Sequence, residues 1–301
     1  MSHDVTTVAN AKPTAAFTSS ANDLAVSFNA GTSEDSDGTI SGYAWKFGDN
    51  STGTGVSPNH TYAAAGSYSV ELTVTDNDGA TDVLTKTVTV TAPTQIAADE
   101  FSRTVNNGWG SADVGGAWTV NSASSFGVSG GDATLTTATS ATRTAFLNGV
   151  SARDVDITTS LSYDKPATGS GIYSAVVGRR IGTSDYRVTI TTTSTKVQVQ
   201  LRRNISGTET SLTTVTLAGG TLAANSSLQI RFQVTGANAT TLRAKVWRDG
   251  DAEPSAWTTS TTDATAALQV AGGVGLYGYL SGSATNSPVT ARFPSFTVKP
   301  V

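Results

Sequence analysis

The chain has no cysteine among its 301 residues. No disulfide can therefore support the fold, and no thiol can act as a nucleophile or bind a metal ion. Histidine occurs only twice, which leaves few side chains that titrate near neutral pH. No apolar run is long enough to cross a bilayer, and residues 1–4 carry neither a basic region nor an apolar stretch. We therefore expect no membrane insertion.

Charged residues are few and unevenly distributed. Residues 1–98 hold 10 acidic and 3 basic residues, a net charge of −7, whereas residues 99–301 hold 13 acidic and 16 basic residues, a net charge of +3. Proteins that bind nucleic acids usually carry a dense basic stripe, so we expect no nucleic-acid partner. The difference between the two parts indicates two surfaces with different tasks.

The segment from Pro13 to Val90 alternates apolar and polar residues in short runs, at 24–28, 41–47, 68–74 and 87–90. A period of two is typical of strands that bury one face. The runs are separated by Asp-, Asn- and Gly-rich turns at 35–38, 48–50 and 76–79. This pattern predicts an Ig-like antiparallel β-sandwich.

An ordered set of motifs in this segment resembles the PKD domain, the polycystic kidney disease repeat. The motifs are Asp37-Gly38-Thr39-Ile40, Tyr43-x-Trp45-x-Phe47-Gly48-Asp49, His60-Thr61-Tyr62, Gly66-x-Tyr68-x-Val70 and Val74-x-Asp76. The resemblance implies an extracellular spacer or adhesion module of the kind found beside bacterial proteases, chitinases and polysaccharide-degrading enzymes. It makes His60 a structural residue near Trp45. The run from Ser33 to Gly38 mimics half of an EF-hand loop, but Ala44 stands where its closing Glu belongs, so we interpret the run as a turn.

Short strands are also expected throughout the second part of the chain, at 171–177, 186–190, 196–201, 228–234, 242–247, 273–280 and 289–298. About two hundred residues of antiparallel strands predict a jelly roll or a related two-sheet sandwich. The expected organisation is a remnant strand or linker in residues 1–11, the Ig-like domain in 12–92, a linker in 93–98 and the jelly roll in 99–301.

Further motifs in the second part resemble the concanavalin A-like lectin/glucanase, or laminin-G-like, jelly rolls of secreted actinobacterial glycan-active proteins and actinophage tail proteins. They are Asp99-Glu100-Phe101-Ser102-Arg103, Gly108-Trp109-Gly110, Gly115-Gly116-x-Trp118-Thr119, Lys245-Val246-Trp247-Arg248, Gly273-Val274-Gly275-Leu276 and Arg292-Phe293-Pro294-Ser295-Phe296. The closing strand of this family often carries two acids where Pro294 and Ser295 stand, which argues against calcium there. Asp99 and Glu100 are the carboxylates we assign to a structural calcium ion.

Catalytic groups are scarce in the second part. Glycosidases need two carboxylates about 5 to 10 Å apart across the scissile bond, and enzymes on the resembled fold typically carry Glu-x-Asp-x-Glu, which is absent here. Glu100, Glu209 and Glu253 are the only Glu residues there, and we place Glu209 in a turn. A lyase would need a Tyr or His base. The second part has no His, so only tyrosine-based chemistry stays open, and no motif in the sequence supports it. We therefore expect no enzymatic activity.

Binding is better supported, because strand alternation collects polar residues on one face. Amide and guanidinium groups hydrogen-bond sugar hydroxyls, and Arg pairs with carboxylate or sulfate. Aromatic rings can stack on the apolar face of a sugar. If the strands concerned are neighbours, these groups form one binding face. The predicted ligand-binding residues are Arg187, Gln198, Gln200, Arg202, Arg231, Tyr173, Trp247, Tyr277 and Tyr279.

These observations predict an all-β, non-catalytic, carbohydrate-binding fragment of a larger secreted protein, with a polysaccharide or cell-envelope glycan as its partner and the PKD domain as a spacer. We expect residues 1–11 to end a preceding sandwich, with the export signal further upstream. The alternative is a structural or adhesive module of a bacterial surface protein or of a phage tail, which would have protein partners; a virion protein needs no export signal.

Overall fold

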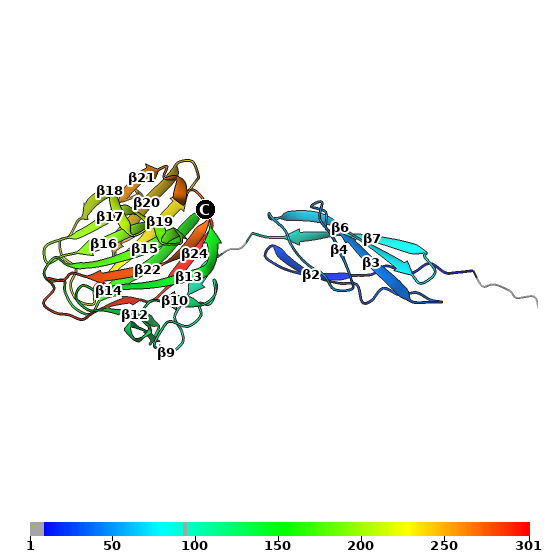
Figure 1. Ribbon diagram of the computed structural model, residues 1–301, viewed down its shortest axis with the longest axis horizontal. Helices are drawn as coiled ribbons and strands as arrows, with labels where there is room; N and C mark the ends of the chain where they lie inside the picture. Colours follow the sequence, from blue (N-terminus) through cyan, green and yellow to red (C-terminus); the bar gives the residue numbers. More distant parts are fainter. Residues whose placement is uncertain (1–8, 93–94) are drawn as a thin grey trace, which may run out of the picture. The chain divides into compact units, whose positions relative to one another are not determined.

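The computed structural model describes residues 9–92 and 95–301 (Figure 1). These residues form two compact units built from antiparallel strands. The described residues contain no α-helix, only two short 3-10 turns at Ala123–Ser125 and Ala266–Leu268, which confirms the all-β class. No helix in the described part of the chain is long and apolar enough to cross a membrane. The remnant strand expected in residues 1–11 falls largely outside the described residues.

The first unit packs a three-stranded sheet, in the order β1-β2-β5, against a four-stranded sheet, in the order β4-β3-β6-β7. The strands are β1 Thr18–Asn22, β2 Ala25–Asn29, β3 Ile40–Lys46, β4 Thr52–Thr54, β5 Asn59–Thr61, β6 Gly66–Asp76 and β7 Thr81–Val90. Trp45 is buried in the core, with its ring 5.1 Å from Phe17 and 5.3 Å from Phe28. Its indole N–H donates to the Gly55 carbonyl at 2.9 Å. This unit is the predicted Ig-like sandwich.

The second unit contains two larger sheets. The seven-stranded sheet has the order β10-β13-β22-β15-β16-β17-β18. Its strands are β10 Trp118–Val120, β13 Thr142–Ala152, β22 Gly272–Leu280, β15 Ile172–Ile181, β16 Ser184–Thr192, β17 Val197–Ile205 and β18 Thr208–Leu217. The ten-stranded sheet has the order β21-β20-β19-β14-β23-β12-β11-β9, with β24 beside β14 and β8 beside β24. Its strands are β21 Thr259–Asp263, β20 Thr240–Arg248, β19 Ser227–Thr235, β14 Val155–Tyr163, β23 Val289–Phe293, β12 Asp132–Thr137, β11 Phe126–Ser129, β9 Val105–Asn106, β24 Phe296–Lys299 and β8 Ala97–Asp99.

One continuous hydrophobic core joins the two sheets. Val188 and Ile190 of β16 belong to it, together with Ile230 and Phe232 of β19. Because successive side chains of a strand point to opposite faces, the residues between them point away from the core. This alternation carries the polar rows of β16, β17 and β19 to the outer faces of the sandwich.

Three expectations about strands are wrong in detail. The expected strand 289–298 is two strands, β23 and β24, because Pro294 between them has no backbone N–H to continue a ladder. Ala97 and Ala98 were expected in the linker but belong to β8, which pairs with β24. The long strands β13 and β14 were not expected, since frequent Thr and Ser residues weaken their apolar alternation.

Candidate functional site

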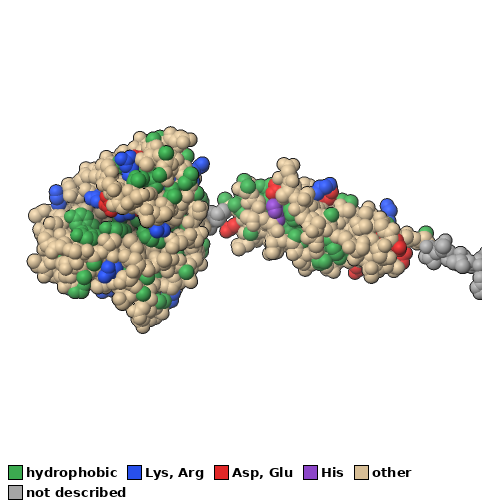
Figure 2. Space-filling model, in the orientation of Figure 1, with side chains coloured by type: hydrophobic (Ala, Val, Ile, Leu, Met, Phe, Trp, Pro, Cys, Tyr) green, Lys and Arg blue, Asp and Glu red, His purple; other side chains and the backbone are tan. Residues whose placement is uncertain are grey.

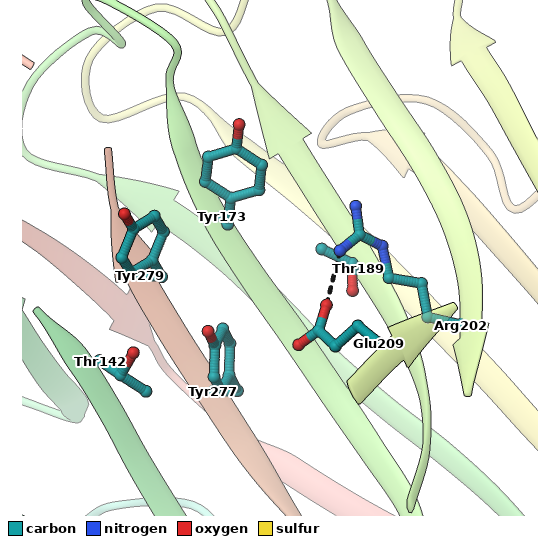
Figure 3. A pocket seen from close by; sticks show the side chains of 7 residues that line it. All are labelled: Thr142, Tyr173, Thr189, Arg202, Glu209, Tyr277 and Tyr279. Carbon is teal, nitrogen blue, oxygen red and sulfur yellow. Dashed lines mark hydrogen bonds and ion pairs between the residues drawn. The ribbon is translucent and has the colours of Figure 1, made fainter. Parts of the chain in front are cut away.

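A pocket of about 270 Å³ lies on the outer face of the seven-stranded sheet (Figure 3). Six neighbouring strands contribute to it, from β13 to β18 in sheet order. The lining residues are Thr142, Tyr173, Thr189, Arg202, Glu209, Tyr277 and Tyr279. On the face of the second unit shown in Figure 2, hydrophobic side chains, a class that includes Tyr, gather beside cationic and acidic ones.

Three tyrosines form one wall of the pocket. Tyr173 of β15 and Tyr279 of β22 are register partners, and their ring centroids lie 5.7 Å apart at an interplanar angle of 55°. Tyr277 follows two residues before Tyr279 on β22, so it points to the same face. Its ring lies 4.9 Å from the Arg187 guanidinium. Burial raises the pKa of Tyr277, so its phenol stays protonated at neutral pH and can donate a hydrogen bond.

An ion-pair network forms the opposite wall. Both oxygens of Glu209 accept from arginines, Oε1 from Arg187 at 2.7 Å and Oε2 from Arg202 at 2.6 Å. The rest of the Arg187 guanidinium donates to both oxygens of Asp185, at 2.7 and 2.6 Å. Arg202 donates in addition to the Gln200 side-chain oxygen at 2.6 Å. Two cations and two anions therefore balance, and the wall is polar without a net charge.

Two buried polar atoms at the pocket have no hydrogen-bond partner among the described residues. They are Oγ1 of Thr189 and Nε of Arg202. Thr189 is only 3% exposed and sits between the tyrosine wall and Arg202 (Figure 3). A buried polar group without a partner costs free energy, so such atoms are expected to bond to water or to a ligand.

The structure brings together only some of the predicted binding residues. Tyr173, Tyr277, Tyr279 and Arg202 line the pocket. Two others lie beside it. Arg187 is 5% exposed and supports Glu209, while the side-chain oxygen of Gln200 accepts from Arg202. Gln198 lies on the same face of β17, opposite Thr191, but does not line the pocket.

Arg231 and Trp247 lie elsewhere, and the expectation that they share the face with Arg202 is wrong. Both belong to the ten-stranded sheet, on β19 and β20. Arg231 donates to Asp156 at 2.6 Å and to Glu253 at 3.0 Å, and hydrogen bonding to Asp156 is the main reason that its pKa is raised. Trp247 lines a separate hollow of about 340 Å³. The alternation along β19 correctly predicts that Arg231 points away from the core. The strand, however, belongs to the ten-stranded sheet and not to the sheet of Arg202.

Three residues of the pocket are absent from the predicted set, namely Thr142, Thr189 and Glu209. Glu209 was placed in a turn, whereas it lies in β18 and pairs with Asn204 of β17. The turn is only Ser206-Gly207, and both residues have positive φ, at 50° and 91°. A two-residue loop of this kind is a strong hairpin signal, and it would have placed Glu209 beside the arginine row.

Asp99 does not suit the expected calcium site. Its side chain is fully buried, and Arg103 donates to both of its oxygens at 2.7 Å. The Trp118 indole N–H donates to Oδ2 at 2.7 Å. A guanidinium thus occupies the position that a cation would need, which corrects the assignment of Asp99 and, with it, the pairing with Glu100. Among the described residues, no group of three or more His, Asp or Glu side chains is arranged to hold a metal ion.

In the first unit, His60 stacks on Phe47 with ring centroids 4.3 Å apart, and its Nε2 lies 2.8 Å from the Asp49 carboxylate. These contacts are structural. At the loop that mimics an EF-hand, Asp37 accepts from the Ala11 backbone N–H at 2.9 Å, whereas both oxygens of Asp35 are buried and have no partner within residues 9–92 and 95–301. Burial, together with nearby Asp37 and Asp76, raises the pKa of Asp35.

Comparison with known proteins supports the assignment of the first unit. The family profile of the PKD domain matches residues 10–92. The pre-pro-metalloprotease PrtV of Vibrio cholerae is 42% identical over 90 residues, which make up 30% of this chain and 10% of that protein. The chain thus corresponds to only a tenth of the length of this relative. Because the relative comes from Vibrio, the actinobacterial or phage source stays a prediction.

Two solved structures resemble the chain at low sequence identity. The β-glucanase of Bacillus licheniformis is 14% identical, with a TM-score of 0.46, and the likeness covers 68% of this chain and 97% of the glucanase. The carbohydrate-binding module CBM66 of Bacillus subtilis is 16% identical, with a TM-score of 0.36, and the likeness covers 65% of this chain and 94% of the module. These likenesses concern the fold and carry no inference about a ligand. Residues 10–92 match the PKD domain, and residues 95–301 form a jelly-roll β-sandwich of two antiparallel sheets.

Proposed function

We propose that this chain is a non-catalytic glycan-binding part of a larger secreted protein, with the PKD domain as a spacer and the pocket on the seven-stranded sheet as the binding site. One observation carries the proposal. A wall of three tyrosines faces a wall of hydrogen-bonding groups, and the unpartnered Thr189 hydroxyl lies between them.

This arrangement suits the two chemical sides of a sugar. The ring presents C–H groups that pack on aromatic faces, and its hydroxyls need hydrogen-bond partners in a pocket. Tyr173 and Tyr279 supply the aromatic surface, while Thr189 and Arg202 supply polar atoms that have no partner in the part of the chain that the structure describes. Such a combination of a mostly fixed apolar surface and a few placed polar groups is typical of small-molecule sites.

The same pocket lacks the groups for glycoside hydrolysis. Its lining contains one carboxylate, Glu209, and both oxygens of that carboxylate already accept from arginines. A general acid would have to be protonated, and a second carboxylate would have to face it across the bond. Incubation of the purified chain with polysaccharides should therefore yield no new reducing ends and no unsaturated products. Either product from a pure sample would contradict the non-catalytic part of the proposal.

The secreted location and the spacer role rest on the first unit. Its PKD match is to part of a protein named a pre-pro-metalloprotease, in which the matched segment is a small share of the length. A compact sandwich with its own core can hold a binding unit away from its parent protein without taking part in binding.

Affinity electrophoresis of the full chain through gels that contain single polysaccharides tests the proposal. We expect at least one polysaccharide to retard the chain, and Tyr279→Ala to abolish the retardation. Trp247→Ala, on the other sheet, is the matched control and should leave the retardation unchanged. If no glycan retards the chain but it adheres to cells or envelope proteins, the adhesive alternative replaces this proposal.

A further inference from the structure

We infer that the pocket accepts one neutral sugar residue and discriminates against uronic and sulfated sugars. This inference rests on the proposed function and specifies its ligand. The charge of the polar wall, the size of the pocket and the position of Thr189 support it.

The arginines of the polar wall are already paired within the chain. In the sequence, strand alternation predicts that arginines gather on one face. Such a basic face would favour an anionic glycan. In the structure, however, Arg187 is committed to Asp185 and Glu209, and Arg202 to Glu209. Arg202 also donates to the Gln200 side-chain oxygen, so among the described residues only its Nε lacks a partner. Neither arginine therefore presents two unpaired nitrogens side by side for the bidentate contact that selects a carboxylate or sulfate.

A second anion in the pocket would also lie close to Glu209. Like charges within a few ångströms disfavour each other, most strongly where solvent is partly excluded. The Arg202 side chain is 20% exposed and that of Glu209 is 29% exposed, so solvent screening of the pair is incomplete. A neutral ring avoids this repulsion and still finds hydrogen-bond donors and acceptors.

The size of the pocket limits the number of sugar rings that it can hold. A volume of about 270 Å³ falls below the range of about 300 to 1,000 Å³ of pockets that enclose a drug-sized molecule. One ring therefore fills the space between the tyrosines and Arg202, and further residues of a chain extend beyond the pocket into solvent.

Thr189 makes the inference testable at a single atom. Its hydroxyl is buried, unpartnered and part of the pocket lining, so a hydroxyl of the bound sugar is the partner that it lacks. Thr189→Val removes this atom and nearly preserves the shape. Because no bond within the chain is lost, stability should be unchanged or slightly higher, whereas binding should weaken about three- to tenfold.

Thr192→Val is the matched control. Thr192 lies on the same strand, and its hydroxyl is also buried without a hydrogen-bond partner. Strand alternation, however, turns it to the opposite face of the sheet, and it does not line the pocket. This variant should bind as the original chain does.

The experiment screens the full chain by affinity electrophoresis against neutral β-glucan, xylan, mannan, galactan and fructan, and against polygalacturonate, alginate and dextran sulfate. Calorimetry then follows the corresponding oligosaccharides from one to six residues. We expect binding to a neutral polymer that barely changes between 50 and about 500 mM salt, where ion pairing is screened. We also expect the monosaccharide or disaccharide to bind within about threefold of the hexasaccharide, because one ring makes most of the contacts.

Each other outcome has a distinct meaning. Binding only to acidic polymers, with strong salt dependence, would overturn the neutral specificity and leave the proposed function standing. Affinity that keeps rising beyond three residues would overturn the single-ring pocket. Unchanged binding by Thr189→Val would overturn the role of this hydroxyl. Retention by none of the eight polymers would instead contradict the proposed function itself.

Discussion

Arg187 and Arg202 lie directly opposite each other on β16 and β17, and the two oxygens of one carboxylate, Glu209 of β18, each accept from one of them. Two like charges in such positions would destabilise the sheet. Glu209 therefore has two consequences. It allows the arginines to be neighbours, and it removes the net charge that they would give to the pocket.

Replacing Glu209 by Gln should convert a neutral pocket into a cationic one. Arg187 stays paired with Asp185, while Arg202 loses its carboxylate and can pair with an anionic sugar. We expect retention on polygalacturonate to rise severalfold at low salt and the gain to disappear at high salt, as measured by affinity electrophoresis. Glu253→Gln, which releases Lys245 on the other sheet while Arg231 stays paired with Asp156, is the matched control. An equal gain in the control would show that the effect is not specific to the pocket.

The first unit should lose stability in acid through Asp49. Hydrogen bonds from Ser51, opposed by partial burial and assisted by His60, lower the pKa of Asp49 from its ordinary value to about 2. Because the folded state holds the proton less tightly than the unfolded state, this contribution is complete above about pH 4 and is lost as the pH falls toward 2. Asp49→Asn has no such titration. The gap in melting temperature between the two proteins should therefore shrink from pH 5 to pH 2, and a constant gap would contradict the assignment.

Ionised Asp35 should destabilise the first unit, whereas ionised Asp49 stabilises it. Its buried, unpartnered oxygens lie near Asp37 and Asp76, and the raised pKa means that ionised Asp35 destabilises the folded state at neutral pH. In a chelator-containing buffer at pH 7, Asp35→Asn should raise the melting temperature of the first unit by a few degrees. Asp37→Asn, which weakens the contact to the Ala11 N–H, should not raise the melting temperature. A lower melting temperature for Asp35→Asn would contradict this interpretation.

The two units should fold separately. Each has its own hydrophobic core, one around Trp45 and the other between the two large sheets. Fragments 9–92 and 95–301 should each show the circular dichroism of β-sheet and a cooperative melt. If either fragment is unfolded alone while the full chain melts cooperatively, the units depend on each other.

Much of the pocket could be predicted from local pattern. Alternation along β16 and β17 correctly turned Arg202 and Gln200 away from the core, and the same rule applied to Tyr277 and Tyr279. These assignments depend only on the period of a strand, which is a local property. The Ig-like unit was predictable for a similar reason, because its turns and aromatic core residues follow one another closely in the sequence.

The pairing between distant strands could not be predicted in this way. Tyr173 meets Tyr279 across 106 residues of sequence, because β15 pairs with β22. Arg231 was misplaced because β19 pairs with β14, in which Thr and Ser interrupt the apolar alternation and which was not recognised as a strand. Sheet membership depends on such long-range contacts, and alternation is the same in either sheet.

The pairing of β8 with β24 determines how the second unit would respond to force. Ala97 lies opposite Val298, so the start of the first strand and the end of the last strand meet at one edge. A pull on both of these ends would load the bonds between them one at a time, as in opening a zipper, and would peel the strands apart at low force. A pull between the first unit and a ligand at the proposed site around Tyr279 would act along another route. It loads β8 at one end and the interior of the seven-stranded sheet at the other, so that many bonds share the tension at once.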